Sequence, residues 1–176
     1  MINKKFEKKS KIYMNDQNEL DKLDWKILIE LSKDARLSFR SLSETLNKSP
    51  VTIKRHIESL EDKGIIKDYG VTIDYEKLGL DIIAVIELTI SKGKMLEVET
   101  DIAKNPNVFG VYDITGEYDA LIFARFKARE DLSKLVKDVN SYDYVIRTNT
   151  HLILNIIKQE TSSLTILEDK LKEFND

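Results

Sequence analysis

The stretch LNKSPVTIKRHIESL, residues 46–60, decides the fold of the first third of the chain. Asn47 tolerates a left-handed backbone better than most residues, Ser49 is a favoured helix N-cap, and Pro50 suits a first helical position because no amide is needed there. Apolar side chains then recur at helical spacing, at Ile53, Ile57 and Leu60. The stretch therefore predicts a tight turn followed by a helix that ends near Gly64.

Two further helices are predicted upstream of this turn. Asp21 can cap a helix whose apolar stripe consists of Leu23, Ile27, Leu28 and Leu31. Ser38 can cap a shorter helix with a stripe at Phe39, Leu42 and Leu46. Three helices with a tight turn between the last two are typical of a helix-turn-helix. We therefore predict a winged-type helix-turn-helix domain over residues 20–66.

A helix-turn-helix places the N-terminal part of its last helix in the major groove, where outward side chains meet base edges. Basic residues in the turn and in the preceding helix lie near the DNA backbone, which they position without reading sequence. The predicted contacts to double-stranded DNA are Arg40, Lys48, Ser49, Pro50, Thr52, Lys54, Arg55 and His56. The alternative is a solvated helix face in a three-helix domain that contacts other proteins.

The charge of the chain is unevenly distributed. The formal net charge is −3, yet residues 1–70 carry 15 Lys/Arg and 12 Asp/Glu, whereas the remainder carries 13 and 19. The basic excess of the N-terminal part favours nucleic acid as its partner. Five lysines lie among residues 1–13. We interpret residues 1–19 as a basic N-terminal arm that contributes no fold.

The rest of the chain predicts an α+β domain. Residues 67–79 resemble an extended linking strand, and beyond them strand-like and amphipathic runs follow in the order β-α-β-β-α-β. That order is typical of a ferredoxin-like sandwich, which we place at residues 80–160. The C-terminal tail, residues 161–176, contains a short helical pattern that we expect to pack on the sheet or on its neighbour.

Two of the predicted strands are apolar on both faces. In residues 81–90 and 119–127, apolar side chains occupy odd as well as even positions. Two helices can cover only one face of a sheet, so the other face requires a partner. We predict a two-fold homodimer through that face. Glu87, Arg125 and Arg147 fall on the partner-facing side, and our hypothesis there is an ion-pair cluster.

The segment ITGEYDALI, residues 114–122, joins two of these strands. A minimal hairpin needs only two residues, so the run from Thr115 to Asp119 is longer than the turn requires. Gly116 would let the backbone approach a ligand closely, backbone amides could meet a carboxylate, and Glu117 or Asp119 could meet an ammonium group. These features match a free amino acid. The alternative is an ordinary acidic surface turn.

The sequence lacks the residues that several classes of site require. The sequence has no cysteine, which excludes disulfides and a cysteine nucleophile and fits a reducing cytoplasm. His56 and His151 lie in different predicted domains without neighbouring ligands, so we predict no metal site. No nucleophile elbow or phosphate-binding glycine loop occurs. No apolar run reaches the roughly 18 residues of a membrane span. We expect a cytoplasmic protein that is not an enzyme, holds no cofactor and binds no membrane.

Taken in order, four segments of the chain resemble the Lrp/AsnC, or feast/famine, family of transcriptional regulators. They are LDKLDWKILIELSKDAR (20–36), SPVTIKRHIESLEDKGIIKDYGVTIDYEKLG (49–79), VYDITGEYDALI (111–122) and VIRTNTHLIL (145–154). The resemblance implies dimers through the sheet that assemble into octamers or similar rings, with an effector, usually an amino acid, bound between dimers. The effector-binding residues it implies are Thr115, Gly116, Glu117, Tyr118, Asp119, Thr148 and Thr150.

The chain departs from the family pattern near the recognition helix. The family's usual glycine and apolar residue in the turn are Asn47 and Lys48 here, and a frequent arginine of the helix is His56. Trp25 stands where a polar residue is common. The turn remains physically reasonable, but the resemblance does not carry over a base preference.

The leading hypothesis is therefore a sequence-specific DNA-binding transcriptional regulator modulated by a small effector. The alternative is an enzyme of tetrapyrrole metabolism, because some relatives with this architecture resemble sirohaem decarboxylases. Such an enzyme would need histidine and basic residues around a tetrapyrrole. The only visible material for that role is His151, Arg125 and Arg147.

Overall fold

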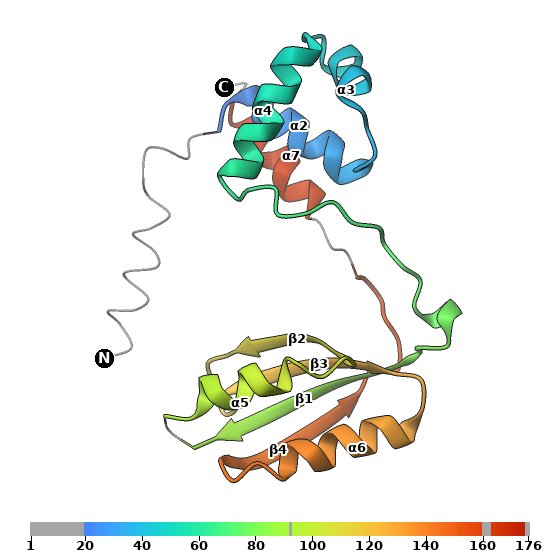
Figure 1. Ribbon diagram of the computed structural model, residues 1–176, viewed down its shortest axis with the longest axis vertical. Coiled ribbons are helices and arrows are strands. Elements are labelled where there is room, and N and C mark those ends of the chain that lie inside the picture. The colour runs from blue at the N-terminus through green and yellow to red at the C-terminus, as the bar shows by residue number, and fades with distance from the viewer. Residues whose placement is uncertain (1–19, 92, 160–162, 175–176) are drawn as a thin grey trace. The chain divides into compact units, whose positions relative to one another are not determined.

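The computed structural model describes residues 20–91, 93–159 and 163–174. These residues form two compact units (Figure 1). The first, which we call the helix-turn-helix unit, combines the residues before Thr72 with the C-terminal helix of the chain. The second, the sheet unit, spans Thr72–Gln159. The basic arm predicted at residues 1–19 lies outside the described residues.

The helix-turn-helix unit contains the three predicted helices: α2 (Lys22–Lys33), α3 (Phe39–Leu46) and α4 (Pro50–Asp62). Each helix begins at its predicted cap, whose side chain accepts hydrogen bonds from backbone N–H groups of the first turn: Asp21, Ser38 and Ser49. The apolar stripes meet in one buried core, formed by Ile27, Leu42, Ile53, Ile57 and Leu60. Burying each such side chain contributes about 1.5–3 kcal/mol. The predicted helix-turn-helix is confirmed.

The C-terminal helix α7 (Leu164–Lys172) belongs to the same unit, where it packs against α2 (Figure 1). The sequence predicts a short helix here but places it on the sheet or its neighbour. That position is wrong, because an apolar stripe of three leucines fits any apolar surface and does not specify which one.

The segment between α4 and the sheet also differs from its prediction. Residues 67–79 contain no strand, only an irregular segment followed by the 3₁₀ turn η2 (Glu76–Leu78). A strand needs a neighbour for its ladder of hydrogen bonds, and none of the described residues pairs with this segment. Its apolar side chains, including Val71 and Ile73, are exposed.

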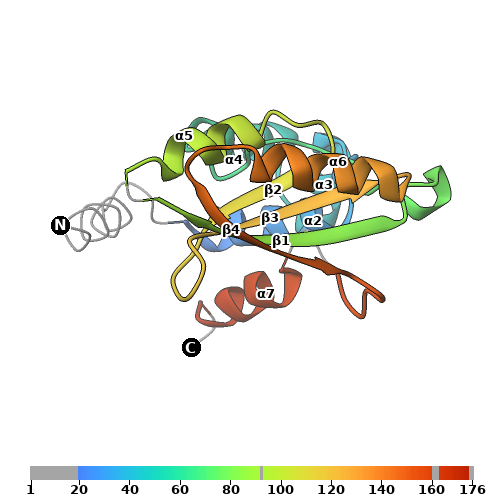
Figure 2. The ribbon, with the colours of Figure 1, turned by 90° about the horizontal axis from the view of Figure 1, so that it is seen from below.

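The sheet unit has the predicted β-α-β-β-α-β order. Its elements are β1 (Ile82–Ile90), α5 (Met95–Ile102), β2 (Val108–Asp113), β3 (Ala120–Phe126), α6 (Arg129–Asn140) and β4 (Val145–Leu152). The strands form one antiparallel sheet in the order β2-β3-β1-β4. Both helices lie on the same side of it (Figure 2). This arrangement confirms the ferredoxin-like prediction.

The two faces of the sheet differ in composition. The face beneath α5 and α6, which we call the covered face, is aliphatic except for Phe126 and is fully buried along β1 and β3: Ala84, Ile86, Leu88, Ala120, Ile122, Ala124 and Phe126. The register places the intervening residues on the opposite, open face: Val85, Glu87, Tyr112, Leu121, Phe123, Arg125, Arg147, Asn149 and His151. Within the sheet unit, no described helix covers the open face.

Candidate functional site

The turn between α3 and α4 fixes where α4 begins. Asn47 adopts the left-handed conformation (φ 51°, ψ 52°), and the backbone N–H of Lys48 donates to the carbonyl of Ser43 at 3.0 Å. Ser49 Oγ accepts a hydrogen bond from the backbone N–H of Thr52 at 3.0 Å and lies 2.8 Å from the Thr52 hydroxyl. The turn chemistry predicted from the sequence is therefore present.

Most of the predicted DNA contacts are exposed around this turn. The solvent-facing residues are Arg40 on α3, Lys48 and Ser49 in the turn, and Pro50, Lys54 and Arg55 on α4, while Thr52 is half-buried beside its cap. Two of the cations have acidic neighbours on their own helices: Arg40 pairs with Glu44 at 3.1 Å, and Lys54 with Glu58 at 3.6 Å. Exposed pairs of this kind are worth at most about 1 kcal/mol, so these cations can exchange them for phosphates.

His56 does not share this exposed face. Its Nδ1 lies 2.7 Å from Oδ1 of the buried Asp24 on α2, and the imidazole is mostly buried. The other Asp24 oxygen accepts the backbone N–H of Asp21 at 3.0 Å, which completes the capping box of α2. His56 therefore links α4 to the start of α2, and we leave it out of the proposed DNA contacts.

The same contact corrects the prediction that His56 has no neighbouring ligand. The ligand atoms of Asp21, Asp24 and His56 lie within 4.8 Å of one another. Three of the four carboxylate oxygens, however, already accept hydrogen bonds: Asp21 Oδ1, Asp24 Oδ1 and Asp24 Oδ2. The positive end of the α2 dipole also disfavours a cation there. The cluster serves as an extended helix cap.

One exposed residue of α4 was missed by the sequence reasoning. Val51, the second residue of the helix, is 79% exposed. An apolar side chain at the N-terminus of a recognition helix can contact the methyl group of thymine. Its position directly after Pro50 was the available signal, because Val51 lies off the stripe of Ile53, Ile57 and Leu60 that fills the core.

In the sheet unit, the loop between β2 and β3 is held by Asp119. Its backbone N–H donates to the carbonyl of Leu88 at 2.8 Å, its carbonyl accepts the N–H of Ile114 at 2.9 Å, and its Oδ2 accepts the N–H of Ile90 at 2.8 Å. Gly116 has φ +133°, a conformation that residues with a side chain rarely adopt. One Asp119 oxygen therefore has a structural role, which restricts the predicted ammonium contact to the other.

The remaining predicted effector residues divide between the two sides of the sheet. Arg147 on β4 reaches back to the loop, where it donates to Glu117 Oε1 at 3.3 Å and to the Tyr118 hydroxyl at 2.6 Å. Thr148 and Thr150 point to the helix side, and Thr148 donates to Asn140 of α6 at 3.1 Å. Thr115 lies in the loop before Gly116. The structure brings Glu117 and Tyr118 together with Arg147, but not with the two threonines.

A further carboxylate, Glu99 on α5, was missed by the sequence reasoning. Burial, together with the negative charges of Asp113 and Asp119, raises the pKa of Glu99 above its usual value. Its Oε1 is buried, and none of the described residues donates a hydrogen bond to it. Helix α5 therefore brings a third carboxylate to Asp113 and Asp119, at the two ends of the loop. The position of α5 relative to Asp113 and Asp119 depends on the fold, so no local sequence signal marks Glu99.

The open face contains a different polar group. Glu87 Oε2 accepts a hydrogen bond from Asn149 at 2.8 Å and lies 3.0 Å from His151 Nε2. These contacts lower the pKa of Glu87. Arg125 instead stacks on the ring of Tyr75, 4.4 Å from its centroid. The ion-pair cluster across a dimer stays a prediction: within one chain Glu87 pairs with His151 and Asn149, and the positive charge of Arg147 also lowers its pKa.

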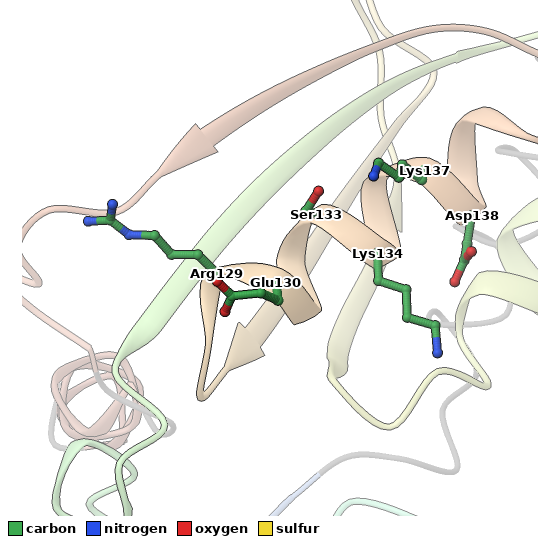
Figure 3. Close-up of a pocket in the computed structure, with 6 residues that line it drawn as sticks. All are labelled: Arg129, Glu130, Ser133, Lys134, Lys137 and Asp138. Atoms are coloured by element: carbon green, nitrogen blue, oxygen red, sulfur yellow. The ribbon is translucent and has the colours of Figure 1, made fainter.

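The hollows of the sheet unit lie elsewhere. One, of about 520 Å³, follows the outer side of α6, and its lining residues all come from that helix (Figure 3): Arg129, Glu130, Ser133, Lys134, Lys137 and Asp138. Another, of about 810 Å³, lies between α5 and the connection from α6 to β4. Ligand pockets usually enclose most of their ligand, and a hollow along one helix does not.

Every helix of residues 20–91, 93–159 and 163–174 is too short or too polar to cross a membrane.

Helix α4 begins in an exposed surface, and the chain continues into a ferredoxin-like unit whose β2–β3 loop is acidic and contains a glycine. These features are typical of one class of protein, a DNA-binding regulator with a ligand-binding domain. The comparisons agree. Residues 20–67 match the winged helix-turn-helix DNA-binding family, and residues 83–163 match the Lrp/AsnC ligand binding domain.

The chain is also similar to whole regulators. It is 44% identical to the HTH-type transcriptional regulator PF1734 and 33% identical to the HTH-type transcriptional regulator FL11, both of Pyrococcus furiosus, over 81% of this chain and 96% and 94% of theirs. It resembles the crystal structure of the transcriptional regulator NMB0573 of Neisseria meningitidis in complex with L-Met, with 33% identity and a TM-score of 0.75 over 82% of this chain and 96% of that one. The chain belongs to the Lrp/AsnC family of transcriptional regulators.

Proposed function

We propose that this regulator binds double-stranded DNA through the N-terminal part of α4 and that an amino acid bound at the β2–β3 loop modulates the binding. The observation that supports DNA binding is the set of exposed cations around a rigid turn: Arg40, Lys48, Lys54 and Arg55. Val51, Ser49 and Pro50 lie among them, at the end of the helix that would meet base edges. Thr52 both caps the helix and borders this surface.

The test compares cations at the two ends of α4. Arg55→Ala should weaken binding to genomic DNA fragments and reduce the slope of log K against log salt by about 1, because a phosphate contact is lost. Lys63→Ala removes the same charge at the C-terminal end of the helix and should leave the slope unchanged. Equal slopes for the Arg55 variant and the parent would refute the placement of the recognition surface.

An amino acid is the proposed effector because the site combines groups that can bind an ammonium with groups that can bind a carboxylate. Glu99, Asp113 and Asp119 concentrate negative charge, and the buried Glu99 oxygen without a hydrogen-bond donor would gain one from an ammonium group. Backbone amides near Gly116 and the Arg147 guanidinium would meet the carboxylate. Thr115, Glu117, Tyr118, Thr148 and Thr150 complete the proposed set. That NMB0573 is known in complex with L-Met supports the class of ligand.

Thermal unfolding in the presence of single amino acids tests this assignment. Glu99→Gln should abolish the stabilisation given by any amino acid that raises the midpoint of the parent. Glu97→Gln is the matched control, because Glu97 lies on the same helix but is exposed. An undiminished shift in the Glu99 variant would remove α5 from the site.

The open face of the sheet is the proposed homodimer interface, and dimers would assemble further into rings with the effector between them. Exposed and half-exposed aromatic side chains cluster there, with Phe123 packed against Phe109 and Tyr112. An effector bound between dimers would favour one assembly and so one spacing of the recognition helices. This linkage would convert amino-acid concentration into DNA affinity.

A further inference from the structure

Helix α2 has two apolar sides, and the helix-turn-helix core uses only one of them. Ile27 and its neighbours on that stripe, Leu23 and Leu31, face α3 and α4. At 3.6 residues per turn, Trp25 and Ile29 lie on the opposite side. Ile29 is nevertheless only 5% exposed and is not part of that core. Another element must therefore cover this side of α2.

Helix α7 is that element. Its half-buried residues follow a helical stripe, Leu164, Leu167 and Leu171, whereas Ile166 on another side of the helix is 61% exposed. Its packing partner in the unit is α2. An amphipathic helix seated on the apolar side of another helix buries both stripes, which is the usual source of stability for a short helix.

Docking of α7 leaves the proposed DNA-binding surface free. Lys54 and Arg55 are exposed in the structure that has α7 in place. Asp24, on the side of α2 that faces α4, holds His56 at 2.7 Å. A helix that immobilises α2 therefore also steadies α4 through this contact.

The geometry points to a C-terminal clasp: α7 is the ligand of a dedicated apolar surface on α2, formed by Trp25 and Ile29, and its docking stabilises the DNA-binding form of the helix-turn-helix. The family matches, at residues 20–67 and 83–163, do not include α7. The clasp lies outside both of these matched regions. The chain leaves the helix-turn-helix unit through residues 67–79 and re-enters it after β4.

The single tryptophan of the sequence is a built-in reporter for this contact. In the full chain, Leu167→Asp should expose Trp25, which would move its fluorescence maximum to longer wavelength and increase quenching by acrylamide. The unfolding midpoint of the helix-turn-helix unit should fall by about 4–8 °C, the usual effect of a modest loss of folding free energy in a domain of this size. DNA affinity should fall at temperatures near the new midpoint.

Ile166→Asp is the matched control, because it places the same charge on the exposed side of α7 and should change none of these quantities. Leu171→Ala is a milder change on the buried stripe and should shift the emission in the same direction by less. Unchanged Trp25 emission and midpoint in both stripe variants would overturn the clasp, as would equal effects of Ile166→Asp and Leu167→Asp. Failure of the Arg55 and Glu99 experiments would leave these outcomes unaffected.

Discussion

The covered and open faces of the same sheet differ in burial and in composition. The covered face has seven fully buried residues along β1 and β3, none of them polar, beneath α5 and α6. The open face alternates aromatic and aliphatic side chains with Glu87, Arg125, Arg147, Asn149 and His151. The first face is satisfied within one chain. The second is the proposed homodimer interface, and its polar groups would select the partner, because a buried polar group must meet its complement.

The largest expected effect lies on the covered face. Phe126→Ala removes a fully buried ring and should lower the free energy of unfolding by about 3–5 kcal/mol. Urea denaturation followed by circular dichroism measures this loss. Phe123→Ala, the same change three residues away on the open face, is the control. If the two variants lost equal stability in monomers, the distinction between the faces would fail.

The next effect concerns association. Phe123→Glu places a charge beside Phe109 and Tyr112 on the open face, so sedimentation velocity should show a smaller assembly while the helix content is retained. The monomer itself should lose only about 0.5–1.5 kcal/mol for each aromatic contact. An unchanged sedimentation coefficient would place the dimer interface elsewhere.

Carboxylates on the two sides of the sheet should also respond to pH with opposite signs. Hydrogen bonds from His151 and Asn149 lower the pKa of Glu87 below 4.5. Its contribution to stability is therefore present above pH 4.5 and is lost as the pH falls through the lower folded value. Glu87→Gln should reduce the stability of the sheet unit near neutral pH and flatten its acid limb, as followed by urea denaturation across the pH range.

Glu99, on the helix side of the sheet, should behave in the reverse way. Burial and the nearby Asp113 and Asp119 raise its pKa above 4.5, so its favourable contribution is present below pH 4.5 and is lost as the pH rises through the folded value. Glu99→Gln should therefore make the protein more stable than the parent near neutral pH. A less stable variant at that pH would show that the carboxylate has a compensating partner.

The smallest effect is expected for Arg147. Its contacts with Glu117 and Tyr118 are exposed, and pairs of this kind contribute about 0–1 kcal/mol. Arg147→Ala should therefore hardly change the urea midpoint of the unliganded protein. It should weaken the thermal shift given by an amino acid, because the proposed carboxylate partner is lost. A large loss of stability without ligand would assign Arg147 a structural role instead.

The predictable parts of this protein are those that depend on near neighbours in the sequence. Asn47, Ser49 and Pro50 specify the turn by themselves, and alternation along β1 and β3 specifies the two faces. The contacts that were missed join distant residues. His56 reaches Asp24, and Glu99 approaches Asp119, only because helices and strands cross.

The same dependence on contacts between distant residues explains the two wrong predictions, the strand at residues 67–79 and the position of α7. Residues 67–79 have the composition of a strand but have no pairing partner among the described residues. The stripe of α7 is equally compatible with the sheet and with α2, against which it packs.

The assembly of the helix-turn-helix unit from both ends of the chain has a consequence during synthesis. About 100 residues separate the end of α4 at Asp62 from the start of α7 at Leu164. At ribosomal rates of about 5–20 residues per second, α2 waits roughly 5–20 s before its last packing partner has been made. Throughout that interval the proposed α7 surface, Trp25 and Ile29, is exposed to solvent, while the whole sheet unit emerges and folds. The DNA-binding unit begins first and is completed last.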